Sequence, residues 1–138
     1  MSFADPEKKL SVDLRLYAIV DPEHAGGRAL PDLARAVAAG GATLVQLRDK
    51  VHEPRAMVEL TRAIKAALPP DVPLIVNDRV DVAREAGADG VSVIAALSLA
   101  PDPAAAAREL RAIVDAALEK HAPVPPATGA GGHFGAAP

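Results

Sequence analysis

The chain has 138 residues, which is enough for one domain with a buried core and too few for two full domains. Its net charge of −3 argues against a dedicated nucleic-acid binder, and its lack of cysteine excludes disulfides and zinc–thiolate sites. No apolar run approaches the ~20 residues that span a bilayer. We therefore expect a cytoplasmic protein with small-molecule ligands and neither nucleic-acid nor membrane partners.

Short apolar runs alternate along the chain with segments of helical periodicity. The runs are predicted strands and cover residues 14–20, 42–48, 72–76 and 89–97. The helical segments carry an apolar residue at every third or fourth position and lie within residues 33–38, 57–68, 80–86 and 103–119. This alternation is typical of a parallel sheet covered by helices. The sequence thus predicts an α/β fold built from four β/α units.

The ends of these segments carry recognisable boundary residues. Asp102 and Pro103 are suited to the N-cap and first position of the last helix. Gly40-Gly41 and Gly87 stand where two earlier helices should stop. We expect the folded domain to span residues 13–120. Residues 1–12 are then a flexible N-terminus, and residues 121–138, rich in Pro, Gly and Ala, a disordered tail.

The second predicted strand ends in Gln46, Arg48, Asp49 and Lys50, an unusual finish for an apolar run. Side chains alternate along a strand, so Gln46 and Arg48 share one face, while the residues between them form an all-apolar face for the helices. Gln46 and Arg48 should therefore point away from the helices, toward the axis of a barrel or cleft. In parallel α/β proteins ligands bind beyond the carboxyl ends of the strands.

Two interpretations of these polar strand ends are open, one as a binding site and one as ordinary structure. Arg48 and Lys50 are suited to a polyanion such as pyrophosphate, and a neighbouring Asp to Mg²⁺. The alternative is structural: a solvated loop after the second strand, and an N-cap formed by Asn77-Asp78 after the third. Asp21-Pro22 reads as a turn. The four histidines read as non-catalytic; they are His24, His52, His121 and His133.

Three blocks in order, LYAIVDP (16–22), GGATLVQLRDK (40–50) and PLIVNDRVDVAREAGADGV (73–91), resemble the thiamine-phosphate synthase/TenI-like family. The resemblance implies a TIM-type (β/α)₈ barrel. It also implies a transferase that couples hydroxymethylpyrimidine pyrophosphate with thiazole phosphate and releases pyrophosphate with Mg²⁺ bound. Such a dissociative reaction needs positive charge on the leaving group more than it needs a general base.

The resemblance also assigns roles by position. Gln46, Arg48 and Lys50 would bind the pyrimidine pyrophosphate, with Arg48 and Lys50 acting as catalytic residues. Asn77 would contact the same ligand, and Asp78 would be one Mg²⁺ ligand. The TenI-like branch, a thiazole tautomerase, does not need this pyrophosphate clamp, so the combination favours the synthase branch.

A full barrel takes about 200 residues or more, whereas this chain has about four of the eight units. The GADGV stretch (87–91) leads directly into residues that resemble the family's last strand and helix, which suggests an internal deletion. Four parallel strands cannot close a barrel alone, so we expect a homodimer or a poorly soluble monomer. The alternatives are a non-catalytic half-barrel that binds a ligand or oligomerises, and an unrelated flavodoxin-like domain.

Overall fold

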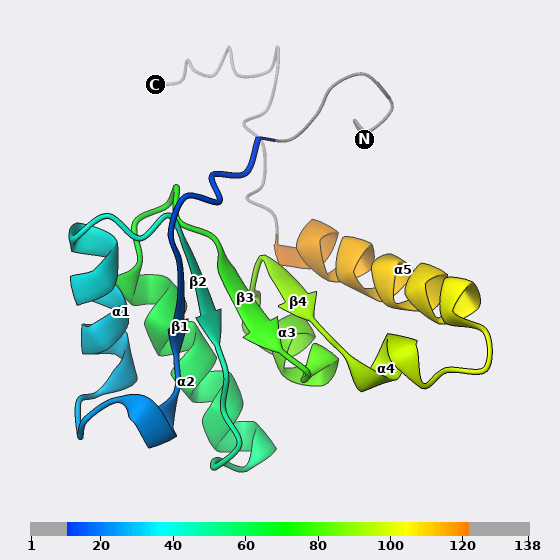
Figure 1. Ribbon diagram of the computed structural model, residues 1–138, viewed down its shortest axis with the longest axis horizontal. Helices are drawn as coiled ribbons and strands as arrows, with labels where there is room; N and C mark the ends of the chain where they lie inside the picture. Colours follow the sequence, from blue (N-terminus) through cyan, green and yellow to red (C-terminus); the bar gives the residue numbers. More distant parts are fainter. Residues whose placement is uncertain (1–10, 122–138) are drawn as a thin grey trace, which may run out of the picture.

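A four-stranded parallel sheet with the strand order β1-β2-β3-β4 forms the centre of the molecule (Figure 1). The computed structural model describes residues 11–121. The strands are β1 (Tyr17–Val20), β2 (Leu44–Leu47), β3 (Leu74–Asn77) and β4 (Gly90–Ser92). All three neighbouring pairs are parallel, which confirms the predicted α/β fold with parallel β/α units.

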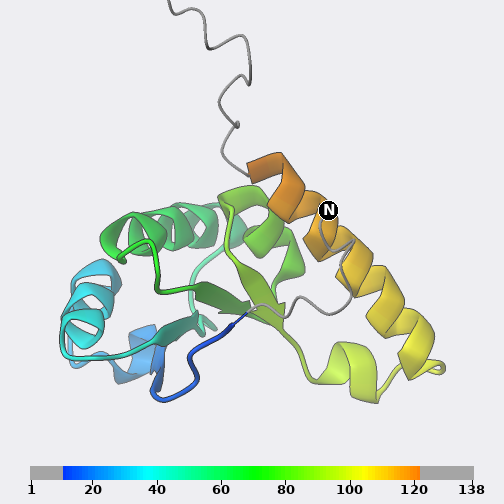
Figure 2. The same ribbon diagram turned by 90° about the horizontal axis from the view of Figure 1, so that it is seen from above.

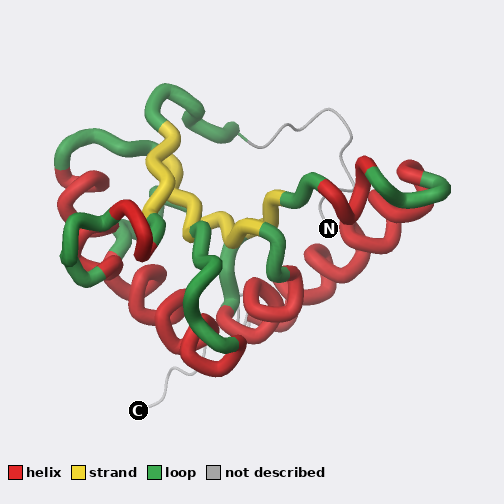
Figure 3. The backbone as a smooth tube through the Cα atoms, turned by 60° about the horizontal axis from the view of Figure 1, so that its bottom comes forward, coloured by secondary structure: helices red, strands yellow, loops and turns green. Residues whose placement is uncertain are grey.

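The connections between the strands are helical. The helices are η1 (Pro22–His24), a single 3₁₀ turn, then α1 (Leu30–Ala39), α2 (Pro54–Ala67), α3 (Val80–Ala86), α4 (Ala95–Ser98) and α5 (Pro103–His121). Figures 2 and 3 show α1, α2, α3 and α5 along one side of the curved sheet. The opposite face carries no helix among the residues described. The arrangement is that of a half-barrel.

The core lies between the sheet and its helices. Val45, Leu47 and Leu74 point toward the helices and are almost fully buried, packed in one cluster with Ala34 and Ile64. This confirms that the all-apolar face of the second strand meets the helices. A smaller cluster joins β3 to α2 and α3 through Met57, Val76 and Val82.

The predicted strand 89–97 is too long. β4 ends at Ser92, and Ala95–Ser98 form the short helix α4. The β-branched residues that favour a strand stop at Ile94, and Ala and Leu, both good helix formers, follow. A short apolar run does not by itself distinguish a strand from a helix, and the apolar run 89–97 was therefore wrongly predicted as a single strand.

Helix α5 begins as predicted, because the Asp102 carboxylate accepts a hydrogen bond from the Ala105 amide at 3.1 Å. Its predicted apolar stripe is only partly covered: Ala117 is its one buried residue, and Leu118 is exposed. The helix extends to His121, the first residue of the predicted tail. Residues 122–138, and residues 1–10 of the predicted flexible N-terminus, lie outside the described residues. No helix within residues 11–121 is long and apolar enough to cross a membrane.

Candidate functional site

The first two strands bring Asp21 and Arg48 together at their carboxyl ends. Val20 is in register with Leu47, so the residues that follow each strand are neighbours. The Arg48 guanidinium donates a hydrogen bond to Asp21 Oδ2 at 3.1 Å, and the Arg48 amide donates to the Val20 carbonyl at 3.0 Å. Arg48 is therefore anchored at its backbone and paired at its head, while its side chain stays 42% exposed.

Asp21 does more than form the predicted turn. Its Oδ1 accepts the Glu23 amide at 2.8 Å and so caps η1, while its Oδ2 pairs with both Arg48 and the His24 ring. The hydrogen bond from the Glu23 amide is the main cause of a lowered Asp21 pKa, and it outweighs the opposing effect of burial. The carboxylate is thus held ionised beside Arg48. The pairing of Asp21 with Arg48 is not among the sequence predictions, although the alignment of the first two strand ends is a signal for it.

Lys50 and Asp78 link the ends of β2 and β3. The Lys50 ammonium lies 3.7 Å from Asp78 Oδ2, and about half of each side chain is exposed. Asp78 lies just beyond the end of β3, with a positive φ of 68° that is uncommon outside glycine. This residue is not in a regular helical or strand conformation, and the turn directs its carboxylate toward the loop after β2.

Gln46 and Asn77 lie on the sheet face that is turned away from the helices. Gln46 is buried, and its Nε2 donates to the Tyr17 hydroxyl at 2.9 Å. Asn77 is in register with Ser92, whose hydroxyl donates to Asn77 Oδ1 at 3.4 Å. The structure therefore brings the five predicted site residues to adjoining strands: Gln46, Arg48, Lys50, Asn77 and Asp78.

A second carboxylate, Asp49, organises the loop after β2. It is buried, and it accepts the amides of Val51 and His52 at 2.9 and 3.0 Å as well as the His52 ring Nδ1 at 2.8 Å. Burial alone would raise the Asp49 pKa, but the hydrogen bonds from His52 and Val51 together lower it. Asp49 precedes Lys50 and binds the two residues that follow it, so these hydrogen bonds fix the conformation of the loop around Lys50. The sequence predicts only that His52 is non-catalytic, and it carries no signal for this contact.

Acidic and histidine side chains do not form a ready-made metal centre in the part of the chain that the structure describes. Nowhere in residues 11–121 do three or more such groups converge on one point. At the strand ends, Asp78 offers one half-exposed carboxylate.

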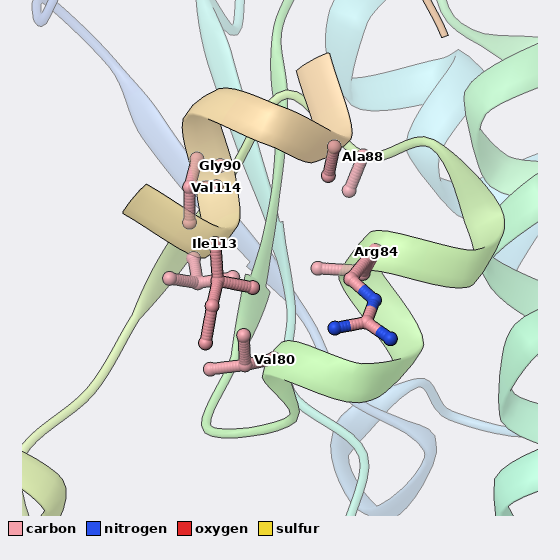
Figure 4. Close-up of a pocket in the computed structure, with 9 residues that line it drawn as sticks. Val80, Arg84, Ala88, Gly90, Ile113 and Val114 are labelled. Carbon is pink, nitrogen blue, oxygen red and sulfur yellow. The ribbon is translucent and has the colours of Figure 1, made fainter. Parts of the chain in front are cut away.

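A small apolar crevice lies elsewhere, between α3, β4 and α5 (Figure 4). Figure 4 shows Val80 and Arg84 of α3 bordering it together with Ile113 and Val114 of α5. Its cavity of about 10 Å³ holds at most one water molecule. It is a gap in the packing of α5 on the helix side of the sheet, away from the polar strand ends.

Residues 16–123 match the family model described as thiamine monophosphate synthase. The chain belongs to this family. That match spans more than half of the chain and covers all four strands and their connecting helices. The family resemblance inferred from the three sequence blocks is thereby confirmed.

Individual members of the thiamine monophosphate synthase family are similar over part of their length. A thiamine-phosphate synthase of Xanthobacter autotrophicus is 54% identical over 80 residues, which are 57% of this chain and 38% of the relative. One of Agrobacterium fabrum is 53% identical over 81 residues, 58% of this chain and 37% of the relative. The thiamine phosphate pyrophosphorylase from Pyrococcus furiosus, a solved structure, aligns with TM-score 0.50 and 34% identity over 56% of this chain and 38% of its own. The chain thus spans well under half the length of these three relatives.

Proposed function

We propose that the strand ends bind the pyrophosphate group of hydroxymethylpyrimidine pyrophosphate, as part of the coupling with thiazole phosphate that makes thiamine phosphate. The main support for this proposal is the position of Arg48 and Lys50 after the same strand, where each faces a carboxylate from a neighbouring strand end. In a family whose named relatives are thiamine-phosphate synthases, this cationic pair is suited to the anionic substrate.

The two cations have different tasks in this proposal. Arg48, fixed by Asp21, offers the remaining donors of its planar guanidinium to phosphate oxygens. Lys50 is a point charge, and its 3.7 Å contact with Asp78 is long and half-exposed. An incoming phosphate therefore readily takes the place of Asp78 as the partner of Lys50. As the pyrophosphate leaves, both cations stabilise the negative charge that develops on it. That step requires no general base.

A magnesium ion fits this donor set only as a companion of the pyrophosphate. Mg²⁺ in nucleotide and pyrophosphate sites is commonly held by one or two carboxylates together with phosphate oxygens and water. Asp78 would supply the single protein carboxylate, and Lys50 would then turn to the phosphate. The ion, when bound, neutralises charge on the leaving group.

Gln46 and Asn77 are proposed to contact the pyrimidine portion of the same ligand. Both present an amide on the face away from the helices, and amides can donate to and accept from ring nitrogens and an exocyclic amine. The hydrogen bond from Gln46 Nε2 to the Tyr17 hydroxyl fixes the direction of the Gln46 amide. Because the two amides lie on adjoining strands, one flat ring can reach both.

The second candidate function is binding without turnover. The chain spans 38% of its relatives and has a four-stranded sheet, which leaves the thiazole phosphate side of the reaction without an assigned residue here. A half-site of this kind can still retain the pyrimidine pyrophosphate. We further propose a cytoplasmic location and a homodimeric state.

Isothermal titration calorimetry with hydroxymethylpyrimidine pyrophosphate in the presence of Mg²⁺ tests the proposal. Arg48→Ala should weaken binding by about ten- to a hundred-fold, the loss of one or two charge-assisted hydrogen bonds. Arg35→Ala is the matched control, since Arg35 forms an exposed pair with Asp32 on α1 and should bind as the wild type does. Equal affinity of both variants would contradict the site, and a coupled assay for thiamine phosphate then separates an enzyme from a binder.

A further inference from the structure

The sheet has two unpaired edges within the described residues. β1 pairs only with β2, and β4 pairs only with β3. Figure 1 shows the two edge strands on opposite sides of the sheet. Exposed edges of this kind offer rows of free amide and carbonyl groups to another strand.

The backbone hydrogen bonds of β1 reveal which groups face its free edge. The Leu16 carbonyl accepts from Thr43 and the Val20 carbonyl accepts from Arg48, both on the β2 side. Bonding sides alternate along a strand in a parallel sheet, so the amide and carbonyl groups of Tyr17 and Ile19 point to the free edge. Their side chains stand on the open face, where Ile19 is more than half exposed.

Large apolar side chains flank both edges. Leu14, Leu16 and Ile19 are more than half exposed beside β1, and Ile94, two residues after β4, is more than three-quarters exposed. Exposed apolar residues gathered at particular places on a protein mark contact sites. Here they gather at the two places where the sheet would have to continue.

We propose that a second copy of this chain closes the sheet, with β4 of each copy pairing in parallel with β1 of the other. A two-fold axis along the barrel preserves strand direction, so a second copy supplies both edges that closure requires. Four strands from each copy give eight, the number at which a parallel sheet closes around a core filled by side chains. The polar and apolar residues of the open face, among them Gln46 and Ile19, then line the interior.

This assembly also completes the site, in a step that rests on the proposed function. All eight strands run in one direction, so both sets of polar strand ends open at the same mouth. The partner subunit's Arg48 and Lys50 would face the same opening as those of the first copy. The open face beside Gln46 and Asn77 becomes an enclosed wall, which excludes water from a bound pyrimidine ring.

Engineered cysteines test the pairing directly, because the chain has none of its own. Within one copy Ile19 and Ser92 belong to opposite edge strands, with β2 and β3 between them. We expect mild oxidation of Ile19→Cys/Ser92→Cys, or of Ile19→Cys/Ile94→Cys to allow for stagger, to give a covalent dimer and no larger species. Ile19→Cys/Arg35→Cys, with Arg35 on α1, is the control and should remain uncross-linked. A ladder of larger oligomers, or no dimer in either pair, overturns the proposal.

Sedimentation analysis of an edge variant tests the same interface without cross-linking. Ile19→Pro removes one amide from the free edge of β1 and none from its ladder with β2. It should sediment as a monomer where the wild type and Ile19→Val sediment as dimers. A monomeric wild type, or a dimer unchanged by Ile19→Pro, overturns the proposal. Neither experiment uses the pyrimidine ligand, so a failure here is distinct from a failure of the proposed function.

Discussion

At the scale of single residues, two buried carboxylates hold the charged strand ends in place. Asp21 anchors Arg48, and Asp49 fastens the loop that carries Lys50. Both have a lowered pKa, so both remain ionised over the physiological range. The cations of the proposed site therefore depend on acidic groups that themselves need not touch a ligand.

These lowered pKa values predict a loss of stability in acid. A carboxyl group whose folded-state pKa lies below its ordinary value near ~3.9 stabilises the fold fully above that value, and the stabilisation disappears as the pH falls through the folded-state pKa. Urea midpoints of Asp49→Asn should thus lie below wild type at pH 6, with the gap closing toward pH 3. Glu59→Gln, an exposed change on α2, should track the wild type. A gap that stays constant across this range would contradict the assignment.

Site residues on strands are predictable from the sequence, whereas contacts within loops are not. Gln46, Arg48 and Asn77 could be placed from strand alternation alone, because their direction is set by period-two geometry. The Asp49–His52 contact could not, since it depends on the conformation of a loop. Loop geometry arises from several local hydrogen bonds at once and leaves no periodic signal in the sequence.

At the scale of elements, the last helix is loosely attached. α5 buries Ala117 alone and borders the crevice against α3. His121 attaches the C-terminal end of α5 to α3. Its ring Nε2 lies 2.9 Å from the Arg84 carbonyl, and the ring also lies against Gly87. Gly87 is the C-cap of α3, with a φ of 80°. The same residue therefore ends α3 and contacts the last residue of α5.

Two glycine substitutions separate these roles of Gly87. Gly27 and Gly87 have nearly the same positive φ, so alanine at either position costs roughly 1 kcal/mol in backbone conformation. A Cβ at Gly27 meets open space, whereas one at Gly87 lies 3.0 Å from the His121 ring. Urea unfolding should therefore show a further loss of about 1 kcal/mol or more for Gly87→Ala. Adding His121→Ala should remove the excess, and equal losses at the two glycines would refute the packing of α5 described here.

The elements themselves were largely predictable. The helix-covered strands 42–48 and 72–76 were found because they are bounded by glycine, proline and charge, and α3 was found at its observed residues. The error at Ala95–Ser98 arose where a short apolar run carried no periodicity to separate strand from helix. The exposure of α5 also escaped prediction, because a periodic stripe shows which side is apolar and not whether a neighbour covers it.

At the scale of the whole molecule, the fold is one side of a parallel barrel. Its helices cover the outer face and its inner face is open (Figures 1 and 2). The polar residues that follow its parallel strands contact one another at one rim. The chain belongs to the thiamine monophosphate synthase family and spans 38% of a solved relative. The predicted internal deletion stays a prediction, which sequencing of the coding region checks.

Thermal unfolding with and without hydroxymethylpyrimidine pyrophosphate and Mg²⁺ shows whether the strand ends bind the pyrophosphate group. A ligand that binds the native state raises the midpoint by mass action, and a hundred-fold excess over Kd contributes about 2.7 kcal/mol. For a domain of this size we predict a rise on the order of 10 °C when both are present, and little change with either alone. Arg48→Ala, with its ten- to a hundred-fold weaker binding, should reduce the rise to about half or less. A cooperative transition whose midpoint does not move with both present would contradict the pyrophosphate site.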